Sequence, residues 1–493
     1  MTEKFARKDG GALMEKSSIL ELVKREKCAV IGIGVSNRPL VEYLLGVGSR
    51  VRAYDKKTRE ALGEIAEELE AKGAELSCGE GYLDSLCEKV IFRSPGIRPD
   101  IEPFLRAKAA GAVVVSEMEL FFELCPTEIY AITGSDGKTT STTLTHLFLS
   151  EEKRRGSSDE GRVFLGGNIG NPLLPEVKSM TEKDISVLEL SSFQLMGGAC
   201  APDAAAITNV TPNHLNWHVD MEEYVSAKRA IVGERTKRVV LNADNAITSS
   251  LDFGEREYIY FSSKKTGYDE VVPENSKKYN ARALFLRDGI ITYSDGASET
   301  PILCASDIKL PGMHNVENYM TAIGLTYGRV ALEVYRSTAK NFGGVEHRLE
   351  LVAEISGVKY YNSSIDSSPT RTAAALSALV EKPIVICGGS DKNLDYAPLA
   401  EALCKRAEAV ILNGESAKKI KAALDACPSF AQSGLRVYEC EKLGGAVDIA
   451  FEIAKEGDVV LLSPASASFD QFDNFMVRGR FFKNAVLSHK EEN

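Results

Sequence analysis

Residues 129–140 read IYAITGSDGKTT, an apolar β-branched run that leads through a glycine-containing turn into a helix-length segment. In such a turn the backbone N–H groups converge on phosphate oxygens, and the positive end of the helix dipole adds to the attraction. Lys138 supplies a cation for the outer phosphates, and the Thr139 hydroxyl is a suitable ligand for Mg²⁺. The stretch therefore predicts an ATP site in a parallel α/β sheet. Its residues are Gly134, Ser135, Asp136, Gly137, Lys138, Thr139 and Thr140.

The turn is a shortened variant of the strict P-loop. The strict pattern places a glycine six residues before the lysine, and here that position holds Ile132. An ordinary glycine-rich connection between a strand and a helix is the competing interpretation, and the intact strand and helix on either side favour the phosphate-binding one.

The same alternation of short β-branched runs and amphipathic helical segments continues on both sides of this turn. Alternation of this kind predicts an α/β fold with parallel sheets. The length of 493 residues suits about three domains at roughly 150 residues each. We expect a flexible extension over residues 1–18, a Rossmann-like domain over 19–122, a central P-loop ATPase-type parallel-sheet domain over 123–344 and a C-terminal Rossmann-like α/β domain over 345–493.

Composition excludes several classes of protein. A net charge of -11 has the wrong sign for a general nucleic-acid binder. No apolar run approaches the roughly 20 residues that cross a bilayer, so no membrane span is expected. The ten cysteines include no C-x-x-C pair, which argues against a zinc site or a disulfide framework. A cytoplasmic protein with reduced thiols is the simplest expectation.

A second glycine turn follows the first predicted strand. Gly32 and Gly34 are followed, about 20 residues later, by Asp55 at the end of the next strand, as in dinucleotide-binding domains. Asn37 replaces the third glycine, which suits a sugar-linked nucleotide better than a nicotinamide dinucleotide. An ordinary tight turn would give the same pattern.

Three polar residues of the central region lie at or after predicted strand ends, where doubly wound sheets bind ligands. They are Glu189, His214 and Lys228. A hydroxyl, a carboxylate and an imidazole can between them hold Mg²⁺ that is bound to phosphate. A buried ion pair at Glu189 and a solvated helix face at Lys228 are the alternatives.

Several spaced motifs resemble the Mur ligase family, the ATP-dependent amide-forming enzymes of bacterial cell-wall synthesis. In chain order they are Ser94-Pro95-Gly96-Ile97, Gly167-Asn168-Ile169-Gly170, Leu188-Glu189-Leu190-Ser191-Ser192-Phe193-Gln194-Leu195, His314-Asn315-x-x-Asn318, Glu346-His347-Arg348 and Leu462-Ser463-Pro464-Ala465-Ser466-Ala467-Ser468-Phe469-Asp470-Gln471-Phe472. The resemblance extends from about Cys28 to Lys483.

The resemblance implies a role for each matched position. In the first domain the UDP-sugar would contact Ser36, Asp55 and Gly96. In the second, ATP and Mg²⁺ would be held by Lys138, Thr139, Glu189, His214, Lys228, Asn315 and Asn318, with Asn168 where nucleotide and acceptor meet. In the third, Arg348 would reach the phosphates, and the incoming amino acid would contact Lys392, Ser468 and Phe475. The lysine that matches Lys228 is carbamylated in relatives, and a carbamate is an anionic oxygen ligand whereas an ammonium repels a metal.

The two longest motifs, Leu188 to Leu195 and Leu462 to Phe472, imply the substrates. We expect ATP-dependent addition of D-glutamate to UDP-N-acetylmuramoyl-L-alanine (UDP-MurNAc-L-Ala) by a monomer, through an acyl phosphate, with release of ADP and phosphate. Lys392 and Ser468 would then bind the glutamate carboxylate.

The chain departs from the family pattern at two places. Asn213 stands where an aspartate commonly precedes the metal-binding histidine. The third-domain loop that often reads Asn-Asp-Ser-Lys here begins Asn362-Ser363, and Asp366 is the candidate substitute for the missing carboxylate toward ATP.

Three alternatives stay open at this point. A sister ligase would add another amino acid, although Ser191-Ser192-Phe193-Gln194 argues against it. A dehydrogenase would explain Gly32 to Asp55 and leave Lys138 without a role. A nucleotide-binding regulatory module would carry the same turns without chemistry.

Overall fold

The computed structural model describes residues 18–34, 37–156, 161–170, 172–198, 200–391 and 394–491. The chain divides into two compact units. The first comprises the described residues up to 287 together with 292–301 and 318–331, and the second comprises 288–291, 302–317 and the residues from 332 onward. Among the described residues, every helix is too short or too polar to pass through a lipid bilayer.

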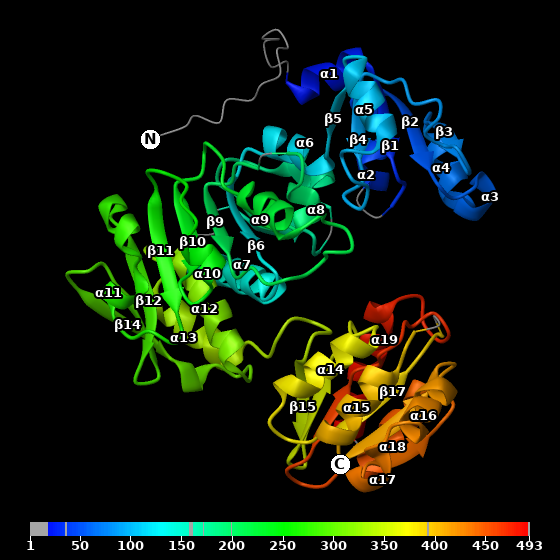
Figure 1. Ribbon diagram of the computed structural model, residues 1–493, viewed down its shortest axis with the longest axis vertical. Helices are drawn as coiled ribbons and strands as arrows, with labels where there is room; N and C mark the ends of the chain where they lie inside the picture. The colour runs from blue at the N-terminus through cyan, green and yellow to red at the C-terminus, as the bar shows by residue number, and fades with distance from the viewer. Residues whose placement is uncertain are drawn as a thin grey trace. The chain divides into compact units, whose positions relative to one another are not determined.

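The first sheet has helices on its faces (Figure 1). Its elements are α1 (Ile19–Arg25), β1 (Lys27–Ile31), α2 (Asn37–Gly46), β2 (Arg50–Asp55), α3 (Arg59–Leu62), α4 (Glu64–Ala71), β3 (Glu75–Cys78), β4 (Val90–Arg93), α5 (Glu102–Ala109) and β5 (Val113–Val115). The strands are parallel in the order β3-β2-β1-β4-β5. Val30 and Phe92 enter one hydrophobic cluster while Ala29 and Ile91 enter another, so both faces are buried, as a parallel sheet requires.

The central sheet carries the glycine turn. Its elements are α6 (Glu117–Leu124), β6 (Glu128–Thr133), α7 (Lys138–Arg155), β7 (Val163–Gly167), η1 (Leu174–Ser179), β8 (Ile185–Glu189), α8 (Ser192–Leu195), β9 (Ala204–Ile207), α9 (Met221–Arg229), β10 (Arg238–Asn242), α10 (Ala246–Ser249), β11 (Glu257–Ser262), α11 (Tyr268–Val271), η2 (Glu274–Tyr279), β12 (Arg282–Arg287), β13 (Ile290–Ser294), β14 (Glu299–Cys304), η3 (Ala305–Asp307), α12 (Met313–Thr326) and α13 (Leu332–Asn341). The order is β14-β13-β12-β11-β10-β9-β6-β8-β7, parallel from β12 to β7. The carboxyl ends of β6, β8 and β9 therefore meet at one edge.

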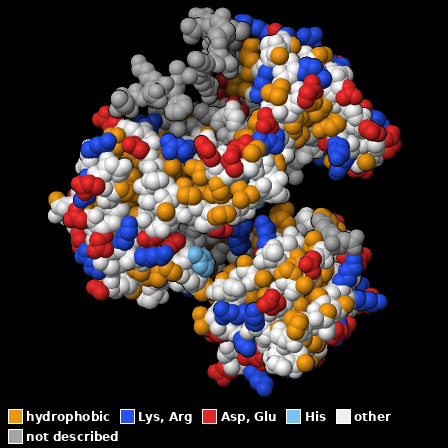
Figure 2. Space-filling model, in the orientation of Figure 1, with side chains coloured by type: hydrophobic (Ala, Val, Ile, Leu, Met, Phe, Trp, Pro, Cys, Tyr) orange, Lys and Arg blue, Asp and Glu red, His pale blue; other side chains and the backbone are white. Residues whose placement is uncertain are grey.

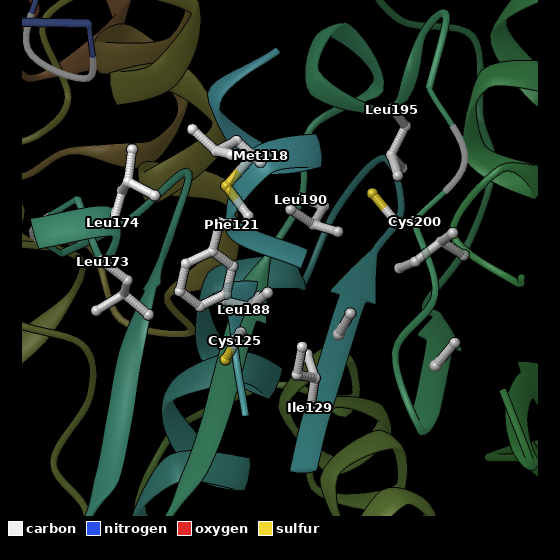
Figure 3. Close-up of a cluster of buried hydrophobic side chains, with 14 of the residues drawn as sticks. Met118, Phe121, Cys125, Ile129, Leu173, Leu174, Leu188, Leu190, Leu195 and Cys200 are labelled. Carbon is white, nitrogen blue, oxygen red and sulfur yellow. The ribbon is translucent and has the colours of Figure 1, made fainter. Parts of the chain in front are cut away.

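One hydrophobic cluster joins the first sheet to the central sheet. It includes Val30 and Phe92 of the first sheet, Met118 and Phe121 of α6, and Leu188 of β8. In Figure 3 the α6 side chains Met118 and Phe121 lie near Leu188 of β8 and near Leu173 and Leu174 at the start of η1. The domain boundary predicted between residues 122 and 123 falls within this helix.

The third sheet belongs to the second unit. Its elements are β15 (Glu350–Ile355), β16 (Val358–Asn362), α14 (Pro369–Ala378), β17 (Ile384–Gly388), α15 (Ala397–Arg406), β18 (Ala409–Asn413), α16 (Ala417–Asp425), α17 (Phe430–Ser433), β19 (Arg436–Glu439), α18 (Leu443–Ile453), β20 (Val459–Leu462) and α19 (Phe475–Glu491). The order is β15-β16-β20-β17-β18-β19; β15 pairs antiparallel with β16, and the other neighbouring strands of this sheet pair parallel. Val385 packs with α15 and Ile386 with α18, so this sheet too is covered on both faces.

Glu117 is a buried acid in the first turn of α6, and its burial raises the pKa of the carboxyl to about 7. The folded state therefore keeps a proton that the unfolded chain releases near pH 4.5, and folding is penalised increasingly as the pH rises from 4.5 to about 7. We expect Glu117→Gln to increase the free energy of unfolding at pH 8 by up to about 3 kcal/mol, at roughly 1.4 kcal/mol per pKa unit. At pH 5 only a small part of that gain remains.

Urea denaturation followed by the fluorescence of Trp217 measures this effect, because Trp217 is the chain's single tryptophan and lies in the same unit. A gain of equal size at both pH values would show that packing, rather than the charge of Glu117, limits stability there.

Candidate functional site

The turn between β6 and α7 is held in a conformation that requires glycine at two positions. Gly134 has φ 150° and Gly137 has φ 78°, values that side chains disfavour. A Cβ at Gly134 would lie 1.9 Å from Thr208 Oγ1, and one at Gly137 would lie 2.2 Å from Asn318 Oδ1. The turn is thus enclosed by the residues after β9 and by α12, which keeps its backbone at a fixed place before the N-terminus of α7.

Hydrogen bonds fix the middle of the turn. Ser135 Oγ donates to the carbonyl of Thr211 at 3.0 Å and lies 3.0 Å from the hydroxyl of Tyr224. The Asp136 N–H donates to Asn209 Oδ1 at 2.9 Å. These bonds join the turn to the segment after β9 and to α9, so hydrogen bonds within the protein hold the turn in place.

Lys138 folds back over the turn. Its Nζ donates to the carbonyls of Gly134 at 3.0 Å and Ser135 at 2.9 Å. Thr139 and Thr140 are buried in the first turn of α7. The predicted phosphate-binding residues are therefore brought together, with an ammonium group and a helix N-terminus beside the same backbone loop.

Lys228 reaches the same carbonyl from α9. Its Nζ donates to Gly134 O at 2.6 Å and lies 4.4 Å from the centre of the Tyr224 ring. The side chain is 2% exposed. Burial, and next the charge of Lys138, lower the pKa of the Lys228 amine to about 6. Near pH 7 this lysine is neutral and nucleophilic, a property that a solvated helix face would not give it.

Glu189 ends β8 with one carboxylate oxygen satisfied and one not. Oε1 accepts a hydrogen bond from Asn168 Nδ2 at 2.7 Å, and the backbone N–H of Asn168 donates to the Glu189 carbonyl at 2.7 Å. Oε2 is buried without a hydrogen-bond partner among the described residues. A buried, unpartnered carboxylate oxygen beside a phosphate-binding turn is chemically suited to a hard divalent cation, so the residues present fit Mg²⁺.

His214 lies in the exposed turn after β9, with a positive φ of 55°. Its ring packs edge-on against Phe193 at 5.0 Å and Tyr224 at 6.5 Å between centroids. These contacts come from the segments after β8 and in α9, so His214 lies among the elements that carry Glu189 and Lys228.

In the first sheet, Asp55 organises the glycine turn. Its Oδ2 accepts from the Ile33 N–H at 2.7 Å, and its Oδ1 accepts from the Lys57 N–H at 2.9 Å. Asn37, at the place of a third glycine, donates from Nδ2 to the Ile31 carbonyl at 3.0 Å. The Gly96 carbonyl accepts from Trp217 Nε1 at 3.2 Å. Ser36 lies outside the described residues.

Three further residues predicted to bind ATP lie in α12 and in the segment before β15. Asn318 Oδ1 accepts from Ser141 Oγ at 3.3 Å, which places Asn318 beside α7. Asn315 belongs to the second unit, where its Nδ2 donates to the Pro311 carbonyl at 2.7 Å. Arg348 lies in the turn before β15, and its backbone N–H donates to Val345 O at 2.9 Å.

Asp366 is buried in the second unit. Its Oδ2 accepts from Ser463 Oγ at 2.9 Å, and burial raises the pKa of its carboxyl. The bond ties Asp366 to the loop after β20. Contact between this carboxylate and ATP stays a prediction.

Ser468 and Phe475 lie at the end of the loop after β20 that leads into α19. Ser468 is buried, and its carbonyl accepts from the Phe472 N–H at 2.8 Å. The Phe475 carbonyl accepts from Ser364 Oγ at 2.8 Å. Lys392 lies outside the described residues.

Sequence reasoning missed two residues that shape these loops. Tyr224 contacts both Ser135 and Lys228. Arg478, buried in α19, donates from NH1 to the carbonyls of Ser466 at 3.0 Å and Ala467 at 2.9 Å. The local signal for Arg478 was an arginine that follows three apolar residues at the start of a helix.

Most of the chain is similar to proteins that are already known. The Mur ligase middle domain matches residues 132–326, and the Mur ligase glutamate ligase domain matches residues 347–466. A UDP-N-acetylmuramoylalanine--D-glutamate ligase of Acetivibrio thermocellus is 44% identical over 94% of this chain and 97% of its own length. The enzyme of the same name from Clostridium perfringens is 42% identical with the same coverage. The crystal structure of a UDP-N-acetylmuramate-alanine ligase from Thermotoga maritima shares the fold at a TM-score of 0.54 and 20% identity, over 94% of this chain and 100% of that one.

Proposed function

The chain belongs to the Mur ligase family, and from this we propose that it is the ATP-dependent ligase that adds D-glutamate to UDP-MurNAc-L-Ala. The observation that carries the proposal is the sequence identity of 40–44% to D-glutamate ligases over nearly the whole chain, with the glycine turn intact. A dehydrogenase or a regulatory module without chemistry would not explain this similarity.

The chemistry begins with a poor acyl donor. A carboxylate cannot expel oxide, so ATP first transfers its γ-phosphoryl group to a carboxylate oxygen of the alanine residue, which forms an acyl phosphate and ADP. The D-glutamate amine then attacks the acyl carbon and loses a proton, and phosphate leaves with the former carboxylate oxygen. The turn, the α7 N-terminus and Lys138 would hold the negative charge of the transferred group.

Magnesium is the cofactor that we propose for this site. Glu189, through its unpartnered Oε2, the Thr139 hydroxyl, His214 and a modified Lys228 are the residues that would hold it. When bound, Mg²⁺ neutralises charge on the phosphate oxygens. Asn168 holds the other oxygen of Glu189 in place and would meet the acceptor carboxylate.

The surroundings of Lys228 support a modification of its amine. A neutral buried amine adds to carbon dioxide through its lone pair, loses one proton and becomes a carbamate. We propose that Lys228 carries this group, because its amine is neutral near pH 7 and the charge of Lys138, which disfavours an ammonium there, would attract an anionic carbamate.

The other substrate-binding assignments complete the proposal. The UDP-sugar would contact Ser36, Asp55 and Gly96; ATP would contact Gly134, Ser135, Asp136, Gly137, Thr140, Asn315, Asn318, Arg348 and Asp366; and D-glutamate would contact Lys392, Ser468 and Phe475. The enzyme would work in the cytoplasm as a monomer.

The decisive assay measures ADP formation with UDP-MurNAc-L-Ala and a panel of amino acids that contains D-glutamate, L-glutamate, L-alanine and L-lysine. We expect turnover only with D-glutamate and a strict need for the acceptor. Release of ADP without acceptor would favour a simple ATPase, and a preference for another amino acid would assign the chain to a sister ligase.

A further inference from the structure

Arg98, just after the Ser94–Ile97 motif, uses all of its donors on three neighbours. NH1 donates to Glu223 Oε2 at 3.0 Å and to the Trp217 carbonyl at 2.8 Å, and NH2 donates to Glu223 Oε1 at 2.8 Å. Nε and NH2 also donate to Asp100 at 2.9 and 2.7 Å. Arg98 follows a strand of the first sheet, whereas Trp217 and Glu223 belong to the central sheet's segment around His214. The guanidinium group therefore joins the two sheets.

The polar chain continues from Glu223 into the central sheet. Glu223 Oε2 also accepts from the Val219 N–H at 2.9 Å and lies 3.2 Å from His218 Nδ1. His218, which is 1% exposed, places Nε2 at 2.9 Å from Ser192 Oγ. Ser192 lies three residues after Glu189. A continuous set of hydrogen bonds thus leads from the loop after β4 to the turn after β8.

Trp217 strengthens the same connection from the other direction. Its Nε1 donates to the Gly96 carbonyl at 3.2 Å, and its ring lies 5.2 Å from the Arg98 guanidinium carbon. Its ring also packs edge-on against Phe193 at 4.6 Å. The segment from His214 to Glu223 therefore has contacts on two sides. Gly96 and Arg98 of the first sheet bind it on one side, and Ser192 and Phe193 of the central sheet contact it on the other.

We propose that Arg98 is a positioning residue: it holds the segment from His214 to Glu223 against the Gly96 loop, so that binding of the acceptor nucleotide in the first sheet and the chemistry at the central sheet share one ordered element. The inference rests on the proposed function for the identity of the acceptor. A planar guanidinium suits the role because it binds one carboxylate through two parallel bonds and still reaches a carbonyl.

The test replaces Arg98 with methionine, which keeps the apolar stem and removes the donors. We expect the dissociation constant of UDP-MurNAc-L-Ala, measured by calorimetry without ATP or Mg²⁺, to increase about 10-fold, because binding must then order the Gly96 loop that Arg98 no longer holds. We also expect kcat to fall about 10-fold because His214 is less well placed, while the KM for ATP changes less than about 2-fold, since the turn around Lys138 has its own anchors. The acceptor affinity and the kcat of Arg98→Lys should lie between those of wild type and Arg98→Met, because an ammonium can keep one of the carboxylate bonds.

Arg106→Met is the matched control. Arg106 is in the same sheet's α5 and pairs with Glu102 of its own helix at 3.2 Å, with both side chains exposed. The Arg106→Met variant should leave the dissociation constant of UDP-MurNAc-L-Ala, the KM for ATP and kcat unchanged, since an exposed ion pair within one helix contributes little to stability. A double variant, Arg98→Met with Glu223→Gln, should lose little more acceptor affinity and kcat than Arg98→Met alone, because the two side chains act through the same ion pair.

Two outcomes would overturn the inference: unchanged acceptor binding in Arg98→Met, or an equal rise of the KM for ATP and for the acceptor, which would indicate general loosening of the fold. The melting temperatures of the variants separate that loosening from a loss of positioning. If wild type binds the acceptor nucleotide but forms no ADP with D-glutamate, the proposed function fails, and the calorimetry still decides the role of Arg98.

Discussion

Replacement of Lys138 by alanine should reduce ADP formation about 1000-fold, the effect of removing a fixed cation from the charge that develops in phosphoryl transfer. The expectation rests on geometry: Lys138 Nζ lies 2.9–3.0 Å from two carbonyls of the turn that precedes α7. The ammonium is therefore held at the loop by the backbone. Loss of the side chain leaves the turn itself anchored by Thr208, Asn209 and Asn318, so the protein should stay folded.

Initial rates with saturating ATP, UDP-MurNAc-L-Ala and D-glutamate measure this prediction. Lys153→Ala is the control, because Lys153 is in the last turn of the same helix and its Nζ donates to the Lys183 carbonyl on the surface. Equal turnover in Lys138→Ala and wild type would remove the phosphate-binding assignment. A similar loss in Lys153→Ala would point to damage of α7 instead.

Lys228→Met should lower kcat by about 100-fold, because it removes both the contact with Gly134 and the group proposed to become a carbamate. The modification itself can be observed. Wild type kept in ¹³C-bicarbonate should show a carbamate carbon signal by NMR, and Lys228→Met should not. The amine is neutral above a pKa of about 6 and protonated below it, so formation of the adduct should decline as the pH falls through 6.

Lys237→Met provides the comparison, since Lys237 is an exposed lysine before β10 and should affect neither the signal nor the rate. Full activity of Lys228→Met, or a carbamate signal that persists in it, would show that another group serves the metal.

The local patterns predicted the α/β class and the glycine turn because both are set by short stretches of chain. A strand buried on both faces is mostly apolar, and this holds for β17 and β20 throughout and for β1 and β6 after their first, polar residue, except that β6 ends in a threonine. The edge strands β3 and β19 lack that signal. Half-buried positions mix polar and apolar residues there, so nothing in the sequence distinguishes these strands from loops.

The site was predicted only where its residues stand close together in sequence or in a known motif. The contact of Arg98 with Glu223 spans 125 positions, and that of Arg478 with Ser364 spans 114. No periodicity encodes such pairs, because each depends on how separate loops meet in three dimensions. The depressed pKa of Lys228 belongs to the same class, since it results from burial against a distant turn.

The hydrophobic cluster around α6 has a consequence for protein engineering. An engineer who wishes to change the acceptor could exchange amino-terminal segments between members of the family. A junction at residue 122 would split α6, whose Met118 and Phe121 pack in one cluster with Leu188. A graft taken through Pro126 would carry the helix whole but would still need a host surface shaped to receive it. The amino-terminal third and the nucleotide-binding sheet are therefore best regarded as parts that must be transplanted together.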